Sequence, residues 1–306
     1  MRRAYRIVTG LLVLAAAGAA AVLIAARLAT RAEIVVPEHA ASAAYGEYLF
    51  AAAGCKGCHT DTADGAVMAA GGRALKTPFG TFYGPNITPH PEHGIGGWSD
   101  ADFIRALRQG VAPDGSDYYP AFPYASFTGM TDTDMLDLKA YLDTLAPAAV
   151  ANRPHDLPLP LKFRPALAVW KLLYLRPGPL AAEGGRTRDW LRGRYLVRAL
   201  GHCGECHTPR DALGGPVADM FLAGTRSGPE GKPIPNITPH DGTGIGGWKP
   251  NDIAFLLEIG MVPDGDFVGA AMGEVVEEST TKLTAEDRAA IAEYLLSLPA
   301  VENAVR

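Results

Sequence analysis

Two short segments of this chain have the residue types and spacing for covalent attachment of a cofactor. The pentapeptide Cys-x-x-Cys-His occupies residues 55–59 and again residues 203–207, and the two copies contain all four cysteines. This is the attachment signature of c-type haem, in which two thiols form thioethers to the porphyrin and the following histidine ligates the iron. The sequence therefore predicts two haems, attached through Cys55, Cys58, Cys203 and Cys206 and ligated by His59 and His207.

A zinc site, a thioredoxin-like redox pair and a disulfide framework are the alternative interpretations of these cysteines. Structural zinc sites usually bring their ligand pairs close in sequence, whereas Cys55 and Cys203 lie in opposite halves of the chain. A dithiol redox motif would not need a histidine after the second cysteine in both copies. The two motifs therefore favour haem.

The sixth ligand of the second haem is predicted to be a methionine. Met272 lies in the glycine-bounded segment 269–273, which we expect to be a loop before the last helix. A methionine opposite the proximal histidine raises the reduction potential of a haem. A core methionine that fills a packing gap is the alternative, and the expected loop position favours Met272 as a ligand.

Beyond its N-terminus the chain repeats itself. Segment 86–90, Asn-Ile-Thr-Pro-His, recurs as 236–240, and segment 94–98, Gly-Ile-Gly-Gly-Trp, recurs as 244–248 at the same offset. A repeat of this length, with one haem motif in each copy, predicts two copies of one domain. The boundaries that we expect are 40–147 and 186–306.

The first copy has no methionine at the position of Met272. The same offset leads to Phe122, whose ring cannot ligate iron. We prefer Met130, in the shorter loop of the first copy, although a hydrophobic staple to Met135 would also explain this residue. The other options are an open iron or ligation by Met68, His90 or His93.

Each copy is predicted to hold three helices separated by long glycine- and proline-rich stretches. The first helix precedes the haem motif, the middle helix of the first copy begins with a capping box, and the last begins at a threonine N-cap. In the first copy we expect the first helix at 45–53, the middle helix to begin at 99, and the last helix to run from 131 to about 145. In the second copy the corresponding helices are expected at 188–200, at 250–259 and from 284 to about 298. Gly46 and Gly193 predict close crossings against Tyr141 and Tyr294 on the last helices.

The N-terminus has the pattern of a membrane anchor. Arg2, Arg3 and Arg6 precede an apolar run over residues 7–26. Twenty helical residues span roughly the 30 Å hydrocarbon core of a bilayer, and the basic end favours the cytoplasmic side. We expect residues 1–30 to be an uncleaved signal anchor, with a cleaved signal peptide as the alternative. In either case the remainder of the chain is exported.

A proline-rich segment, residues 148–185, connects the two copies. Proline-rich chain is stiff and extended, but residues 167–174 are too apolar for a free linker. We expect a strap that packs across both domains, with Trp170 as its anchor. A short helix that docks on the membrane surface or on a partner is the competing interpretation.

The combination of Cys-x-x-Cys-His, Asn-Ile-Thr-Pro and Gly-Ile-Gly-Gly-Trp resembles the cytochrome c subunits of membrane-bound periplasmic dehydrogenases that oxidise alcohols, gluconate, aldehydes or N-heterocycles. The resemblance covers nearly everything after residue 40. It implies a mostly α fold with a tandem repeat of two class I-like cytochrome c domains behind a transmembrane helix. Many such subunits carry three haem motifs, and this chain has two, which leaves its partner and its electron exit route open.

The resemblance also implies a function. We expect an electron-transfer subunit in the inner membrane of a bacterium, with periplasmic haem domains. It would accept electrons from a dehydrogenase and pass them to quinone, a soluble cytochrome or a terminal oxidase. The alternatives are a dihaem enzyme of the peroxidase or thiosulfate-oxidising type, which needs an open iron, and a dedicated donor to a terminal oxidase. A net charge of −5 gives no reason to expect nucleic acid as a partner.

Overall fold

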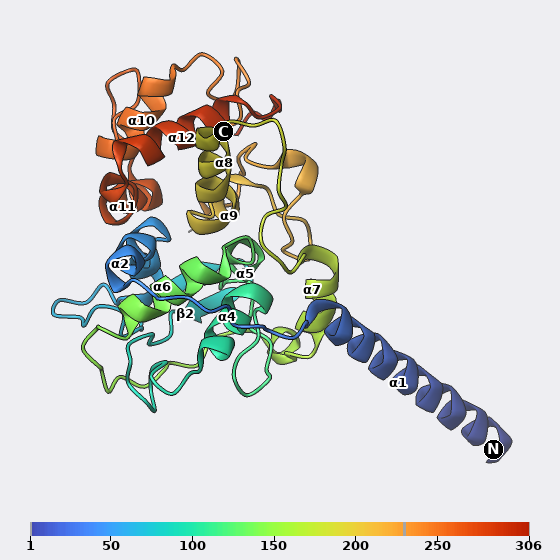
Figure 1. Cartoon of the computed structure of the whole chain (residues 1–306). Helices are drawn as coiled ribbons and strands as arrows, with labels where there is room; N and C mark the ends of the chain where they lie inside the picture. The colour runs from blue at the N-terminus through green and yellow to red at the C-terminus, as the bar shows by residue number, and fades with distance from the viewer. Residues whose placement is uncertain (1, 229–230, 306) are drawn as a thin grey trace.

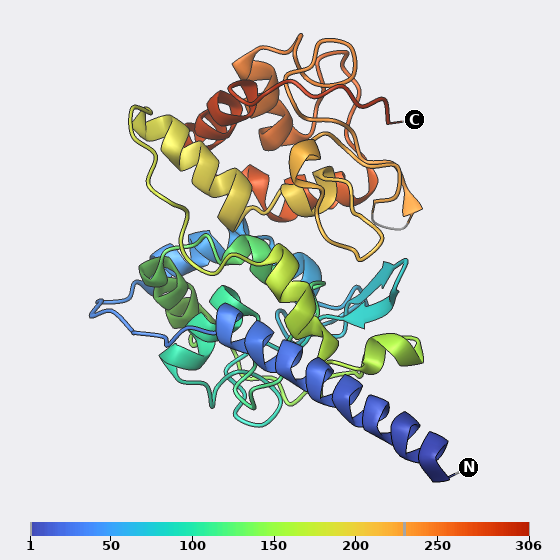
Figure 2. The ribbon, with the colours of Figure 1, turned by 90° about the vertical axis from the view of Figure 1, so that its right-hand side faces the viewer.

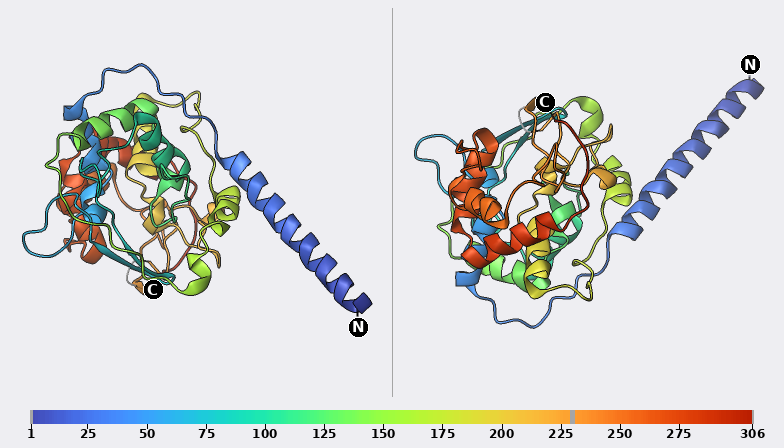
Figure 3. Two further views of the ribbon diagram at one scale, coloured as in Figure 1. Left: turned by 90° about the horizontal axis from the view of Figure 1, so that it is seen from below. Right: turned by 90° about the horizontal axis from the view of Figure 1, so that it is seen from above.

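The computed structural model describes residues 2–228 and 231–305. The protein is mostly helical, with one long N-terminal helix, α1 (Arg2–Thr30), that projects from a body of short helices and long loops (Figure 1). Views from below and above show that α1 leaves one side of this body (Figure 3). The body has two lobes, joined by a segment that runs between them (Figure 2).

Each lobe contains a haem motif and the helices around it. The first lobe contains α2 (Ala43–Ala52), α3 (Cys55–His59), β1 (Ala74–Thr77), β2 (Gly80–Tyr83), α4 (Asp100–Gln109), α5 (Tyr124–Phe127) and α6 (Asp132–Leu142). The connecting segment contains η1 (Leu159–Lys162) and α7 (Ala166–Tyr174). The second lobe contains α8 (Arg188–Tyr195), η2 (Leu196–Leu200), α9 (Gly204–His207), η3 (Ala218–Met220), α10 (Pro250–Ile259), α11 (Ala270–Glu278), η5 (Thr280–Lys282) and α12 (Ala285–Leu296).

The predicted helix starts are confirmed by their caps. Ser99 and Asp102 form the capping box that begins α4, and the hydroxyls of Thr131 and Thr284 cap α6 and α12. The last helices end at Leu142 and Leu296, slightly earlier than expected. The helix before the second motif is not regular throughout, because α8 continues into the π-helical turn η2.

The predicted glycine crossings are also confirmed. A Cβ added to Gly46 would lie 1.9 Å from the carbonyl oxygen of Asp137 on α6, and one on Gly193 would lie 1.9 Å from that of Ala290 on α12. Side chains at these two positions would therefore hold the helices apart. Each lobe is built on one such crossing, between the helix that leads into the haem motif and the last helix.

The first lobe contains a β-hairpin that the sequence did not indicate. β1 and β2 pair as an antiparallel hairpin, in register from Ala74 opposite Tyr83 to Thr77 opposite Gly80. The corresponding stretch of the second lobe carries an isolated bridge between Thr225 and Ile234. The two lobes therefore share their helical framework and differ in their loops.

Helix α1 has the length and composition of a membrane span over Tyr5–Thr30. Its side chains are almost all exposed, except near its C-terminal end, where Ala26 and Thr30 are buried. At this end α1 packs against α7. The apolar part of α1 is therefore left uncovered by the rest of the protein.

The connecting segment contacts both lobes. The Trp170 indole N–H donates to the carbonyl of Leu213 in the second lobe at 3.1 Å, and its ring meets Tyr124 of the first lobe edge-on. The Tyr174 hydroxyl donates to Asp211 at 2.7 Å. These contacts make α7 a packed element rather than a free linker.

Candidate functional site

The first haem motif forms a single helical turn, α3, directly after α2. Gly54, with φ of 60°, makes the bend between the two helices. The His59 Nδ1 lies 2.8 Å from the carbonyl oxygen of Pro85, so this nitrogen carries the proton and donates it. Burial lowers the pKa of His59, and the bond to Pro85 offsets this only in part. The ring is therefore neutral, and its unprotonated Nε2 has a lone pair that can ligate a metal.

The second motif has the same arrangement. His207, at the end of α9, has its Nδ1 2.9 Å from the carbonyl oxygen of Pro235. Burial also lowers the pKa of His207. Metal-ligating histidines usually donate their second ring N–H to a backbone carbonyl or carboxylate, which fixes the tautomer and the ring orientation. Both histidines meet this requirement.

A buried asparagine holds the carbonyl behind each histidine in place. Asn86 follows Pro85, its Oδ1 accepts from the backbone N–H and the hydroxyl of Thr88, and its amide donates to the carbonyl of Ala148. Asn236 makes the corresponding bonds to Thr238 and Val301. The two asparagines therefore stabilise the same turn in both lobes. The proline carbonyls were not anticipated, although a proline precedes the asparagine in both copies.

The four cysteines form no disulfide and lie within the fold without being fully covered. Burial raises the pKa of Cys55 and of Cys203 to about 12. Within the described ranges, no group of three or more His, Cys, Asp or Glu side chains is placed to hold a metal ion. Paired cysteines beside one oriented histidine therefore fit covalent haem and do not fit a protein-only zinc site.

Met130 is fully buried, immediately before the N-cap Thr131. Met135, on the first turns of α6, is buried in the same hydrophobic cluster. This location agrees with the packing alternative and leaves ligation by Met130 a prediction. Met68, one of the other options, is exposed.

Met272 lies on α11, so the expectation of a loop at this position was wrong. Residues 270–278 include alanine, methionine and three glutamates, which are good helix formers. Met272 is partly buried against the core cluster. Its ligation of the second haem also stays a prediction.

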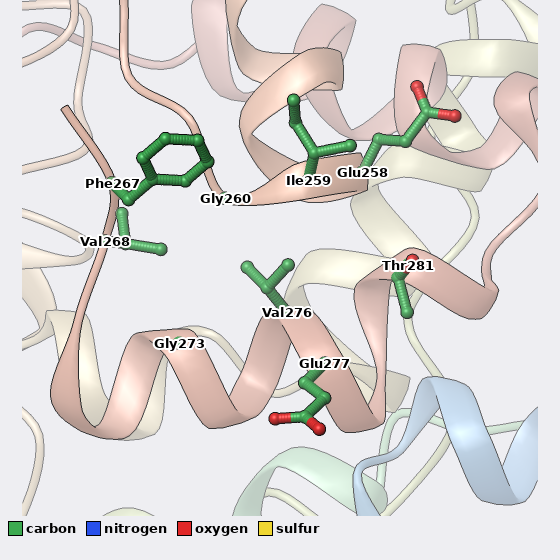
Figure 4. A pocket seen from close by; sticks show the side chains of 9 residues that line it. All are labelled: Glu258, Ile259, Gly260, Phe267, Val268, Gly273, Val276, Glu277 and Thr281. Atoms are coloured by element: carbon green, nitrogen blue, oxygen red, sulfur yellow. The ribbon is translucent and has the colours of Figure 1, made fainter. Parts of the chain in front are cut away.

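An open pocket of ≈ 330 Å³ lies between α10 and α11, close to Met272 in sequence (Figure 4). Ile259, Val268 and Val276 give it an apolar wall, and Glu258 and Glu277 lie at its edge. Neither haem motif lines it. The pocket therefore adjoins the helix that carries Met272 without including a residue of either motif.

The two motifs lie at the interface between the lobes. The Lys56 ammonium, inside the first motif, donates to Glu278 of the second lobe at 2.7 and 2.8 Å. Glu205, inside the second motif, accepts from the hydroxyl of Ser126 in the first lobe at 2.6 Å. Burial, Glu205 and, more weakly, Cys58 raise the pKa of Cys206 to about 11.

A reciprocal pair of hydrogen bonds strengthens this interface. The Tyr48 hydroxyl on α2 donates to Asp287 on α12 at 2.5 Å, and the Tyr195 hydroxyl on α8 donates to Asp134 on α6 at 2.5 Å. Each tyrosine leads into one motif, and each aspartate is the third residue of the other lobe's last helix. The lobes therefore meet in an approximately two-fold arrangement.

A mostly helical fold with Cys-x-x-Cys-His turns and carbonyl-backed histidines defines the class of c-type cytochromes. A family model described as Cytochrome c matches residues 43–146. The chain is 47% identical over 264 residues to a diheme cytochrome c-type protein of Cereibacter sphaeroides, covering 85% of this chain and 87% of the relative. The chain therefore belongs to the cytochrome c family, whose members bind haem c covalently, and the predicted resemblance is confirmed.

Other relatives are named as cytochrome subunits of dehydrogenases. The chain is 40% identical to the fructose dehydrogenase cytochrome subunit of Gluconobacter japonicus and 40% identical to the gluconate 2-dehydrogenase cytochrome c subunit of Pantoea cypripedii. The aligned regions cover 86% and 83% of this chain but only 54% and 59% of these relatives. The chain therefore spans just over half the length of both subunits.

Proposed function

We propose that this protein is a dihaem electron-transfer subunit with two cytochrome c domains. The domains are residues 40–147 and 186–306, the connecting strap is 148–185, and residues 1–30 are the anchor. The constant offset of the sequence motifs and the pair of equivalent helix crossings at Gly46 and Gly193 support the repeat.

One observation carries the proposal. Two haem-attachment motifs with the same histidine–carbonyl bond lie against a shared interface, where Lys56 and Glu205 of the motifs each pair with the opposite lobe. Two redox centres held at a fixed separation suit transfer of electrons through the protein. A single-centre carrier would not need the reciprocal Tyr48–Asp287 and Tyr195–Asp134 bonds.

The proposed haem-binding residues follow from the motifs. Cys55 and Cys58 would hold the first haem and Cys203 and Cys206 the second, with His59 and His207 as proximal ligands. Bound haem supplies reversible one-electron chemistry at its iron. The chain orients each histidine through a proline carbonyl, excludes water with its buried helices, and offers Met272 and Met130 as proposed sixth ligands.

The proposed partner is the catalytic subunit of a dehydrogenase, because several relatives are named as dehydrogenase cytochrome subunits. The proposed acceptors are quinone, a soluble cytochrome or a terminal oxidase. The proposed location is the inner membrane of a bacterium, with both haem domains in the periplasm. Helix α1 supports this location by its length and apolar composition.

Purification from solubilised membranes tests the proposal. We expect the full chain to retain its N-terminal helix, to carry two haems by intact mass, and to co-purify with a dehydrogenase whose substrate reduces both haems. A mass with fewer than two haems would contradict the dihaem assignment. Isolation with a terminal oxidase, and no reduction by any dehydrogenase substrate, would favour a dedicated oxidase donor.

A further inference from the structure

Exposed apolar side chains gather where α1 leaves the body. Leu159 on η1 is 82% exposed, and Phe163, which follows η1, is 60% exposed. Leu172 and Leu173 on the outer side of α7 are also exposed. Large apolar residues grouped on one surface usually mark a site that is covered in the working protein.

The position of this surface identifies what covers it. Helix α1 packs on α7 through its C-terminal end, where Ala26 and Thr30 are buried. Figure 2 shows η1, the short yellow-green turn beside the blue helix, projecting from the body in the same direction as α1. A bilayer crossed by α1 would therefore lie directly against η1 and α7.

A single buried aspartate fixes these elements relative to one another. The Asp117 carboxylate accepts from Lys171 of α7 at 2.6 Å and from Arg31, just after α1, at 2.8 Å. The Asp117 backbone carbonyl accepts from Arg164, just after η1, at 3.0 Å. The Lys171 and Asp117 side chains are 0% and 1% exposed. Asp117 therefore connects the chain just after α1 to α7 and to the residue that follows η1.

Further contacts keep η1 in its projecting position. The Tyr119 hydroxyl donates to the carbonyl of Leu161 at 2.9 Å. Lys162 on η1 and Arg176 after α7 are exposed beside the apolar side chains. Long cationic side chains reach headgroups while neighbouring apolar groups enter the acyl region. The surface thus has the composition of an interfacial membrane contact.

We propose that residues 159–163 and the outer side of α7 insert into the interface of the bilayer that α1 crosses. This inference rests on the proposed anchor and adds a second, peripheral contact to it. Interfacial segments of this kind are buried about 5–10 Å into the boundary between the headgroups and the acyl chains. The transmembrane helix α1 and this interfacial contact together would hold the body and both haem motifs in one orientation to the membrane.

Nitroxide labelling of the haem-loaded full chain in phosphatidylethanolamine–phosphatidylglycerol nanodiscs tests the inference. Thioether formation leaves no native thiol, so Phe163→Cys introduces one labelling site. We expect this label to collide more with oxygen and less with a water-soluble nickel chelate than a label at Phe267→Cys. Phe267 is a matched control, because it is 61% exposed and lies in the second lobe.

A third label, at Val13→Cys on α1, separates this inference from the proposed function. If the label at residue 13 reports lipid and the label at 163 matches the control at 267, the peripheral contact is wrong and the anchor stands. If the label at 13 also reports water, the anchor itself is wrong, and the inference falls with it. If Phe163→Cys does not load haem, Leu159→Cys takes its place with the same expected result.

Discussion

The stretch before the last helix is built differently in the two lobes. At the same offset, Asp117 in the first lobe corresponds to Phe267 in the second, and Phe122 corresponds to Met272. Asp117 is buried and ion-paired, whereas Phe267 is exposed. In the first lobe, Asp117 in this stretch binds Lys171 of the connecting segment and Arg31 just after α1. In the second lobe the stretch continues into α11, which lines an open pocket.

The rings around Phe122 show the consequence of this difference. Phe122 lies 5.5 Å from Tyr118, 6.2 Å from Tyr124 and 5.9 Å from Phe127, measured between ring centres. Such aromatic clusters pack tightly, and the Phe122 ring itself cannot ligate iron. In the second lobe the same region presents a thioether. If both lobes carry the proposed haems, we expect the two haems to have different properties.

The largest expected effect comes from the ion pair that only the first lobe has at this position. Asp117→Asn leaves the Lys171 ammonium buried without its charge partner, which costs about 3–5 kcal/mol of unfolding free energy. Thermal or denaturant unfolding of the haem-loaded protein measures this loss. Phe267→Asn, at the corresponding exposed position, should change stability by less than about 0.5 kcal/mol. Equal losses of unfolding free energy in Asp117→Asn and Phe267→Asn would contradict the claim that this position is structurally important in the first lobe alone.

A smaller effect tests what the lobes share. Gly46→Ala and Gly193→Ala each place a methyl group against a carbonyl oxygen at a helix crossing, and we expect each to cost about 1–3 kcal/mol. Gly247→Ala is the control, since nothing lies within 4 Å of the added carbon. A loss at only one of the two crossings would argue against an equivalent framework.

Replacement of the two methionines tests the haem assignments. Met272→Ala should lower the reduction potential of the second haem or make it high-spin, because the thioether ligand is lost. Met130→Ala should do the same to the first haem alone. Optical and electron paramagnetic resonance spectra of each variant report the change. An unaltered first haem in Met130→Ala would identify Met130 as a packing residue, and a naturally high-spin first haem would favour the enzyme alternative.

The smallest effect is a pH dependence at the interface. Burial acts to raise the pKa of Asp287, but hydrogen bonds from Arg192 and Tyr48 outweigh it and hold the pKa below its usual value. This interaction therefore stabilises the protein above the unfolded-state pKa of roughly 3.9 and is lost as the pH falls through the lower folded-state value. Unfolding measured across acidic pH should show a shallower decline in Asp287→Asn. An unchanged slope would mean that this carboxylate does not contribute to the stability of the protein in acid.

Local patterns in the sequence predicted the framework well. The threonine caps at 131 and 284, the capping box at Ser99 and the glycine crossings all depend on neighbouring residues or on repeated motifs. The haem motifs are recognised from their fixed spacing, and attachment at these residues stays a prediction.

The remaining features depend on contacts between distant segments. Nothing near Asp117 in sequence indicates Lys171 and Arg31 as partners, and the Tyr48–Asp287 bond joins residues from different lobes. The helical state of Met272 was missed because its flanking glycines outweighed the helix-forming residues between and after them. Tertiary packing decides such positions, and local propensity alone does not.

Potentiometric titration of the haem absorbance in the purified full chain tests the central claim most directly. Two covalent haems in unlike surroundings should give two one-electron steps of equal amplitude at different midpoint potentials. Met272→Ala should then move one step and leave the other in place. Absorbance equivalent to one haem, or two steps that coincide and move together in Met272→Ala, would contradict the account.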